Sequence, residues 1–496
     1  MIKDILSILD LNFILLVFLG SISGLFVGAM PGLSVTMATA LLVSVTFTWE
    51  TNSAMAVIMG VYTVGVYSGA VTAILINIPG APSSVATTLD GYPMAQKGEA
   101  LRALKTAAYY SFLGTIVGLF ILAVSAKQVA KLALAFTPID YFLLALFGLT
   151  TVGSLTSENF TKGMLSALAG VFISTIGMDP IMGIGRFTYG NVNLQRGISI
   201  IPALIGLFGF SEILYQTSLK HKDVRAVEVI KDTVSIKEIF SHWALGIRSS
   251  IIGVLIGALP GAGGPVASLI AYDQGKRTTK NPKVPFGEGA MEGIVASEAA
   301  NNACIGGALI PMLTLAVPGD AVTAVILSAF YVHGLRPGPL LFTETPEMFS
   351  VILAGGFIGS IMILILGLTV APLLSRIVTI KQRHLFPIVA VLCIIGSYAA
   401  STNTFDILLM LIFGVLGFIM RRRGYAVAPM VLGLVLGGIM DANFRRAMSL
   451  LRSSENIIGD LFFKPITIVL IIFVVLSIVS NFVSIKEINN KIVKKN

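Results

Sequence analysis

The sequence GLFVGAMPG at residues 24–32 recurs as GVLIGALPG at residues 253–261. Five of the nine positions are identical, and the other four exchange one apolar residue for another. A second pair of breaks follows, because Asn77-Ile78-Pro79-Gly80 ends one apolar run and Ala316-Val317-Pro318-Gly319 ends its counterpart. The chain is therefore predicted to contain two related halves, each interrupted twice by Pro-Gly.

The composition places these halves in a membrane. Of the 496 residues, 55% are hydrophobic and 12% are charged, and the mean hydropathy is +0.90, whereas an average soluble chain carries about 25% charged residues. Apolar runs of about twenty residues recur along the chain, as a helical span requires, while membrane β-barrels use alternating strands of about ten. We expect an all-α polytopic membrane protein with about 10–13 helical segments, some of them broken or re-entrant.

Charge and cysteine content exclude several other classes. The 34 Lys and Arg against 25 Asp and Glu give a net charge of +9. The basic residues lie mainly between apolar runs, so we interpret them as orientation signals and expect no nucleic-acid partner. Cys304 and Cys393 each lie in an apolar neighbourhood, which fits neither a disulfide framework nor a cysteine metal site.

The repeat suggests an organisation for the whole chain. We predict a first membrane repeat at 1–216, a cytoplasmic interfacial linker at 217–242, a second membrane repeat at 243–440, and a connector with a last transmembrane helix at 441–496. If every apolar run between the two copies crosses the membrane, the repeats are parallel. One re-entrant run makes them inverted, and we favour the inverted arrangement.

Paired breaks at corresponding places in two halves point to the substrate site of a secondary transporter. An unsatisfied backbone group in lipid costs several kcal/mol, so a break is tolerated where it lines a polar cavity or packs in protein. The broken end of a helix offers free N–H groups and a positive dipole end, which suit an anion. For any single Pro-Gly, the alternative is a helix end or a packing kink.

The segment after the first break is dense in hydroxyls and small residues, which suits binding of carboxylate oxygens. The alternative is an ordinary polar loop. The Gly-rich second break lacks the Lys followed by Ser or Thr of a nucleotide-binding loop, so an ATPase is disfavoured. The predicted substrate-binding residues are Asn77, Pro79, Gly80, Ser83, Ser84, Thr87 and Thr88 in the first half and Gly261, Ala262, Gly263, Gly264, Pro318 and Gly319 in the second.

Four further polar residues are candidates for binding the coupling ion: Asp90, Glu298, Asn301 and Asn302. Glu298 and Asn302 lie one helical turn apart and share a face. Carboxylates and amides in a membrane segment indicate function by default, here a Na⁺ site or a proton relay. The alternatives are that Asp90 caps a turn and that the others cap a helix at the interface. No other cofactor is indicated.

Through these residues, the sequence resembles the large membrane subunit of the tripartite tricarboxylate transporter family. The resemblance covers about residues 20–440 and is carried by motifs at 28–33, 77–80, 90–95, 260–263, 298–303, 314–319 and 333–339. It implies a bacterial inner-membrane permease, not an enzyme, for carboxylates such as citrate. It also implies a periplasmic solute-binding protein, a small membrane subunit of about four helices, and an ion gradient as the energy source.

One residue departs from the family pattern. Asp320 follows the second Pro-Gly, where the family more often has a small or hydroxyl residue. A carboxylate there would repel an anionic substrate unless a cation lies between them. Two other classes stay open: an intramembrane enzyme acting on a lipid-linked acid through Asp90, Glu298 or His333, and a passive anion channel. The internal duplication argues against the enzyme, because an enzyme needs only one set of catalytic residues.

Overall fold

The fold is known from a computed structural model. It describes residues 2–30, 33–155, 160–179, 182–219, 236–371, 385–399, 402–452 and 464–493, and the single residues 227, 374 and 459. Pro31 and Gly32, the first of the predicted breaks, lie outside the described residues.

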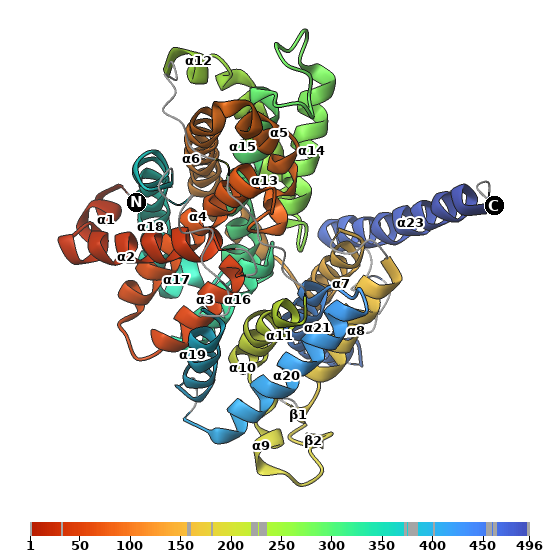
Figure 1. Ribbon diagram of the computed structural model, residues 1–496. Helices are drawn as coiled ribbons and strands as arrows, with labels where there is room; N and C mark the ends of the chain where they lie inside the picture. Colours follow the sequence, from red (N-terminus) through yellow and green to blue (C-terminus); the bar gives the residue numbers. More distant parts are fainter. Residues whose placement is uncertain are drawn as a thin grey trace. The chain divides into compact units, whose positions relative to one another are not determined.

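The described chain is almost entirely helical (Figure 1). The elements up to residue 218 are α1 (Ile2–Ile8), α2 (Leu11–Gly28), α3 (Val35–Val45), α4 (Thr51–Ile76), η1 (Pro82–Ser84), α5 (Val85–Met94), η2 (Ala95–Glu99), α6 (Ala100–Ala133), α7 (Pro138–Leu155), α8 (Phe160–Ser174), β1 (Gly177–Met178), β2 (Gly185–Arg186), α9 (Val192–Gln195), α10 (Ile200–Leu204), η3 (Ile205–Phe210) and α11 (Ser211–Ser218).

The remaining elements are α12 (Ile236–Phe240), α13 (Trp243–Gly257), α14 (Gly263–Thr278), α15 (Met291–Leu315), α16 (Ala321–Val332), α17 (Leu341–Glu344), α18 (Pro346–Thr369), α19 (Leu385–Ala399), α20 (Thr404–Arg422), α21 (Val427–Arg452) and α23 (Pro465–Val493). β1 and β2 form a two-stranded antiparallel hairpin.

Seven helical stretches within the described residues are long and apolar enough to cross a membrane, and shorter apolar helices accompany them. The predicted fold class, an all-α polytopic membrane protein, is confirmed. The seven stretches are Leu11–Gly28, Thr51–Ile76, Pro82–Ala133, Ile200–Ser218, Pro346–Thr369, Thr404–Arg422 and Val427–Leu450.

The chain divides into two compact units, each built from two separate stretches. The larger unit contains Met1–Ala130 and Ile201–Phe418, and the smaller contains Lys131–Ile200 and Ile419–Asn496. All predicted site residues belong to the larger unit. Within the smaller unit, α21 packs on α7 and α8, and α23 packs on α7.

Two helix pairs in the larger unit approach each other closely through glycine. In the pair α2–α4, a Cβ atom built on Gly24 would lie 2.7 Å from the carbonyl oxygen of Val61. In the pair α13–α15, a Cβ atom on Gly253 would lie 2.2 Å from the carbonyl oxygen of Ala300. Both distances are far below contact separation, so these backbones meet only because glycine is present, as is common between membrane helices.

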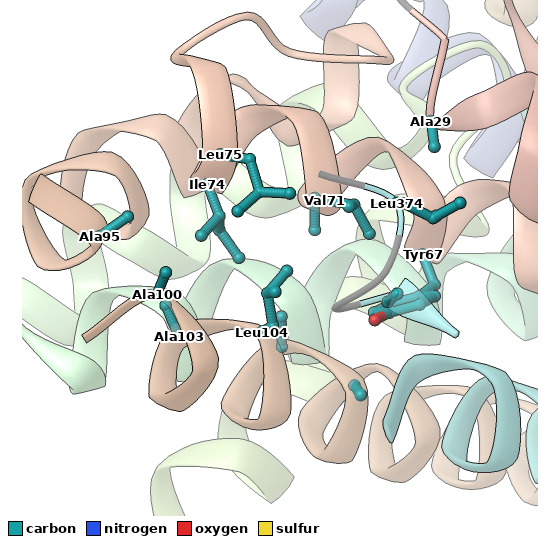
Figure 2. Packing of buried hydrophobic residues seen from close by; sticks show 14 of the residues in the cluster. Ala29, Tyr67, Val71, Ile74, Leu75, Ala95, Ala100, Ala103, Leu104 and Leu374 are labelled. Carbon is teal, nitrogen blue, oxygen red and sulfur yellow. The ribbon is translucent and has the colours of Figure 1, made fainter. Parts of the chain in front are cut away.

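An apolar cluster holds α4 against the region around η2 and α6. Figure 2 shows Val71, Ile74 and Leu75 of α4 facing Ala100 and Leu104 of α6. All five side chains are fully buried. Residues of α4 and α6 therefore belong to one buried apolar cluster beside the break that follows α4.

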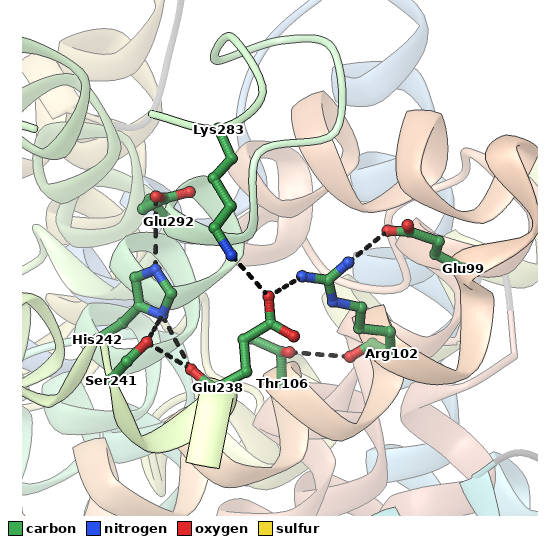
Figure 3. A network of polar contacts seen from close by, with 8 residues as sticks. All are labelled: Glu99, Arg102, Thr106, Glu238, Ser241, His242, Lys283 and Glu292. Atoms are coloured by element: carbon green, nitrogen blue, oxygen red, sulfur yellow. Dashed lines mark hydrogen bonds and ion pairs between the residues drawn. The ribbon is translucent and has the colours of Figure 1, made fainter. Parts of the chain in front are cut away.

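The linker between the predicted repeats falls largely on residues 220–226 and 228–235, which lie outside the described residues. Its last part is α12, which packs against α6: the Tyr110 hydroxyl donates to the Ile239 carbonyl at 2.6 Å. A network of charged side chains surrounds α12 (Figure 3), in which Glu238 pairs with Arg102 of α6 and with Lys283 at 3.4 Å. The predicted cytoplasmic location of this linker stays a prediction.

Candidate functional site

The helices before the second breaks of the two halves end in the same way. α4 is followed by Asn77 with φ 57° and ψ 26°, and α15 is followed by Ala316 with φ 57° and ψ 28°. Both residues adopt the left-handed conformation, which stops a helix and which alanine rarely adopts. The separation in sequence between Asn77 and Ala316 equals that between Pro79 and Pro318. The two helices therefore end at corresponding positions of the predicted halves, and with the same backbone conformation.

The glycine of each break packs against the end of an earlier helix. A Cβ atom on Gly80 would lie 2.3 Å from the carbonyl oxygen of Gly28, at the end of α2. A Cβ atom on Gly319 would lie 2.5 Å from the carbonyl oxygen of Gly257, at the end of α13. Gly28 and Gly257 occupy the same position in the repeated nine-residue sequence. These matched contacts support the predicted repeat.

Residues from the two halves converge around Asn301 of α15. A Cβ atom built on Gly264 would lie 2.5 Å from Asn301 Oδ1 and 3.0 Å from Ser83 Cβ. The structure thus brings together the start of α14, the η1 turn after the first-half break, and the middle of α15. Asn301 is 1% exposed, and within the described residues neither its amide oxygen nor its amide nitrogen has a hydrogen-bond partner.

An uncapped helix start adjoins this asparagine. α14 begins at Gly263 and follows Ala262, which provides no side-chain cap. The first amides of an α-helix have no partner within the helix, and they carry the positive end of its dipole. Asn301 contributes a neutral amide donor and acceptor beside them. A buried, uncapped helix start next to an unpartnered amide is a suitable environment for one carboxylate group.

Glu298 lies one turn before Asn302 on α15 and is fully buried. Its Oε1 accepts a hydrogen bond from the Thr87 hydroxyl of α5, and its Oε2 accepts from the Ser111 hydroxyl of α6 at 2.9 Å. The Asn302 amide donates to the same Oε2 at 3.3 Å and to Ser111 Oγ at 2.8 Å. The predicted face shared by Glu298 and Asn302 is therefore present and holds three helices together.

All donors to Glu298 are neutral. None of the ion pairs formed within the described part of the chain includes this carboxylate. An ionised carboxylate buried without a cation is costly, so such groups become protonated or bind a cation. This environment is compatible with the predicted role of Glu298 in binding H⁺ or Na⁺, which stays a prediction.

Asp90 has a different environment. Its Oδ1 accepts from the backbone amides of Gly287, Gly289 and Ala290 at 2.8 to 2.9 Å, and its Oδ2 accepts from the Tyr272 hydroxyl at 2.8 Å. A carboxylate has about four acceptor positions, and four donors are present. In this geometry Asp90 anchors the loop before α15 to α5, whereas the alternative considered from the sequence was a cap on the turn into the next helix.

The other predicted substrate residues occupy several environments. Ser83, Ser84 and Thr87 are buried, and Ser84 Oγ has no partner within the described residues. Thr88 donates to the Val85 carbonyl of its own helix at 2.7 Å, and Asn77 is exposed at the end of α4. The remaining predicted residues are backbone positions of the breaks: Pro79, Gly80, Gly261, Ala262, Gly263, Gly264, Pro318 and Gly319.

Three residues of these networks were not predicted as site residues. Ser111 bonds Glu298, Tyr272 bonds Asp90, and Tyr62 donates to Asp320 Oδ2 at 2.9 Å. Ser111 lies within an apolar run, where a single serine usually bonds its own helix, so the sequence carries no clear signal for it. Tyrosines in membrane proteins most often mark interfaces, which hides the two buried ones.

The chain matches a known protein family over most of its length. A family model described as "Tripartite tricarboxylate transporter TctA family" matches residues 14–432. The chain is 36% identical over 463 residues to an Agrobacterium vitis protein described as "Uncharacterized 52.8 kDa protein in TAR-I ttuC' 3'region", with 92% of each chain covered.

A second Agrobacterium vitis protein, "Uncharacterized protein in TAR-II ttuC' 3'region", is 39% identical over 205 residues, which cover 41% of this chain and 84% of that protein. No solved structure matches the chain significantly. The family match covers most of the chain and the motifs on which the resemblance rested. The chain belongs to the tripartite tricarboxylate transporter TctA family, a transporter family, and is a multi-pass membrane protein.

Proposed function

We propose that the protein is the large subunit of a secondary active transporter that imports a di- or tricarboxylate, such as citrate, across the bacterial inner membrane. The observation that carries this proposal is the unpartnered, buried Asn301 at the point where residues of both halves meet. One carboxylate of the substrate binds there, against the start of α14 and the η1 turn. Family membership supports the substrate class.

The driving force in this proposal is a cation that binds Glu298. Its carboxylate lacks a cationic partner in the described chain and lies on the same helix as Asn301. Cation binding there neutralises the buried charge, so loading of the ion and loading of the anionic substrate favour each other. We assign Asn301 to the substrate, Glu298 and Asn302 to the coupling H⁺ or Na⁺, and Asp90 to anchoring.

The proposal includes two protein partners implied by the family resemblance. A periplasmic binding protein delivers the carboxylate, and a small membrane subunit of about four helices completes the permease. The two halves act as inverted repeats that expose the site to one side of the membrane at a time. The matched contacts of Gly80 and Gly319 support a repeat, and the inverted orientation is part of the proposal.

The test is uptake of labelled citrate and related carboxylates by proteoliposomes that contain this chain with its small subunit. Uptake is measured with and without the binding protein and with imposed Na⁺ or H⁺ gradients. We expect saturable uptake that requires the binding protein and one of the gradients. Uptake that neither saturates nor depends on a gradient would indicate a channel and contradict the proposal.

A variant pair tests the site itself. Asn301→Leu removes the unpartnered amide while keeping a similar volume, and we expect it to reduce carboxylate uptake at least about tenfold, the effect of about 1.4 kcal/mol of lost binding. The control is Ser328→Ala on α16, which removes a buried hydroxyl that bonds only its own helix, to Ala324. Equal uptake in both variants would show that Asn301 does not touch the substrate.

A further inference from the structure

A short hairpin in the smaller unit exposes a group of large apolar side chains. β1, β2 and α9 lie together after the end of α8 (Figure 1), and we call the described residues 177–179 and 182–197 the hairpin segment. Its Tyr189 is 90% exposed. Five more of its large apolar residues are exposed: Met178, Met182, Ile184, Phe187 and Val192. An apolar group of this size marks contact with a membrane or with another protein.

The backbone of the hairpin segment holds its two aromatic residues in an unusual conformation. Phe187 has φ 54° and Tyr189 has φ 47°, in the left-handed region that bulky residues rarely adopt. Both rings are exposed, whereas the side chain of Thr188 between them is buried. The strained turn therefore directs both rings away from the protein, and strain of this kind is typical of functional segments.

The exposed surface of α8 leads directly to this turn. α8 is an apolar helix that packs on α7 and α21 and exposes Leu165, Leu168 and Phe172. These three residues are spaced by three and four, so they share one face, and in a membrane protein an exposed apolar face of this kind contacts lipid. The ring centroids of Phe172 and Phe187 lie 5.2 Å apart. The apolar surface of the hairpin segment thus continues the lipid-facing surface of α8.

The length of α8 places the hairpin segment close to the membrane. Near the start of α8, Lys162 Nζ donates to the Arg423 carbonyl at 2.7 Å, and this basic end of the unit marks one membrane surface. α8 has 15 residues, which span about 22 Å, whereas the hydrocarbon core is about 30 Å thick. The chain therefore leaves α8 before the far surface is reached, and the hairpin segment lies in the remaining depth.

The charges at the base of the hairpin segment are paired with those of α21. Arg186 lies 2.8 Å from Asp441, and Asp179 lies 2.7 Å from Arg445. Arg445 also lies 2.9 Å from Asp441, one turn before it. Both α21 residues belong to a stretch that is apolar enough to span a membrane, where a charged side chain is costly unless it is paired. The network contains two acids and two bases, so its net charge is zero.

We propose that the hairpin segment anchors the smaller unit to phospholipid. Its apolar residues insert into the boundary between headgroups and acyl chains, and the paired charges at its base fix it to α21. Tyr189 suits this depth because its ring is apolar and its hydroxyl can reach the headgroups. Continuity with the exposed face of α8 favours lipid over a protein partner. This role goes beyond the proposed function and is independent of the carboxylate site.

The test uses a single tryptophan as a reporter of lipid contact. The chain has two tryptophans, Trp49 and Trp243, and both are replaced by phenylalanine before Tyr189→Trp is introduced. The full-length protein is placed in nanodiscs of phosphatidylcholine with brominated acyl chains, or in unbrominated nanodiscs with iodide in the buffer. We expect the brominated lipid to reduce the fluorescence strongly and iodide to reduce it little.

Two control reporters in the same background define the limits of this measurement. Phe172→Trp on α8 represents lipid contact, and Lys283→Trp, at a side chain that is 86% exposed in the loop before α15, represents contact with water. Quenching of Tyr189→Trp by iodide as strong as that of Lys283→Trp, without loss in brominated nanodiscs, would place the hairpin segment in water and overturn the proposal.

The same measurement distinguishes lipid from a protein partner. It is repeated after the small membrane subunit has been incorporated into the nanodiscs, and we expect the quenching of Tyr189→Trp by brominated lipid to stay the same. Loss of this quenching on addition of the subunit would assign the exposed surface to a protein interface and overturn the lipid assignment.

A charge exchange tests whether the ion pairs hold the hairpin segment in place. Arg186→Glu brings a like charge against Asp441, so we expect the Tyr189→Trp reporter to lose contact with brominated lipid and to become accessible to iodide. Combining Arg186→Glu with Asp441→Arg restores an opposite pair and should restore the lipid contact. Unchanged quenching in Arg186→Glu, or no recovery in the combined variant, would overturn the role assigned to the ion pairs.

Discussion

Two polar regions of the larger unit contain glutamates with different partners, basic side chains in one region and neutral donors in the other. Around α12, Glu238 pairs with Arg102 and Lys283, and its side chain keeps 28% exposure (Figure 3). On α15, Glu298 is fully buried and receives hydrogen bonds from hydroxyls and an amide alone. In the α12 network, the charge of Glu238 is balanced by opposite charges. The Glu298 network contains no positive charge among the described residues, which fits the cation binding that we propose there.

The largest effect is expected for Glu298→Gln, which removes the charge while keeping the shape of the side chain. The hydroxyls of Thr87 and Ser111 can turn to accept from the new amide, so the protein should fold. We expect cation-stimulated uptake to fall at least about tenfold, with gradient-independent exchange less affected. Uptake by proteoliposomes across a series of Na⁺ and H⁺ gradients measures this.

The matched control is Glu292→Gln on the same helix, because Glu292 lies 3.4 Å from His242 Nε2 in the α12 network. The same chemical change there should leave the ion dependence of uptake as in the unmodified protein. If both variants lost cation stimulation equally, the presence or absence of a basic partner beside a glutamate would not determine its role in ion coupling.

Asp90 lies between these two cases, because its donors are neutral but number four, three on Oδ1 and one on Oδ2. Asp90→Ala leaves three backbone amides and the Tyr272 hydroxyl without their partner. At about 1–3 kcal/mol for each unsatisfied buried group, we expect a large drop in the midpoint of thermal unfolding. Asp90→Asn should lower the midpoint of thermal unfolding less than Asp90→Ala does, and it should keep the ion dependence of uptake. Altered ion dependence in a stable Asp90→Asn protein would return Asp90 to the coupling site.

The smallest effect is expected for Glu238→Gln in the α12 network. The Glu238 side chain stays 28% exposed, and ion pairs in contact with water contribute about 0–1 kcal/mol, so the midpoint of thermal unfolding should shift only slightly. The shift should shrink further in high salt, which screens exposed charges. The midpoints of thermal unfolding of the variant and the unmodified protein, measured at low and at high salt, test both expectations. A large loss of uptake in this variant would indicate that α12 takes part in transport.

The sequence predicted the parts of the site that depend on local pattern. The Pro-Gly breaks marked the ends of α4 and α15, and the spacing of Glu298 and Asn302 predicted their common face. Interrupted helices and helical periodicity are readable because both follow from backbone geometry within one segment. The helical membrane fold was predictable for the same reason.

Contacts between distant segments were not predictable. Nothing near residue 287 indicates that its backbone donates to Asp90, and nothing near Ser111 indicates Glu298 as its partner. The grouping of Lys131–Ile200 with Ile419–Asn496 into one compact unit also has no local signal, so the predicted boundaries at 216 and 440 stay predictions. These features depend on how whole helices pack, and a single sequence does not record that.

The close glycine contacts within α2–α4 and α13–α15 have a mechanical consequence. Backbones that meet at Gly24 and Gly253 have no long side chains between them to change rotamer, so neither pair can slide without a clash. Each pair therefore moves as one rigid body, and any hinge must lie outside it. Residues outside the two pairs, in η1 and α14, meet Asn301 where the two halves converge, so the proposed carboxylate site lies where a movement of one pair relative to the other would be felt.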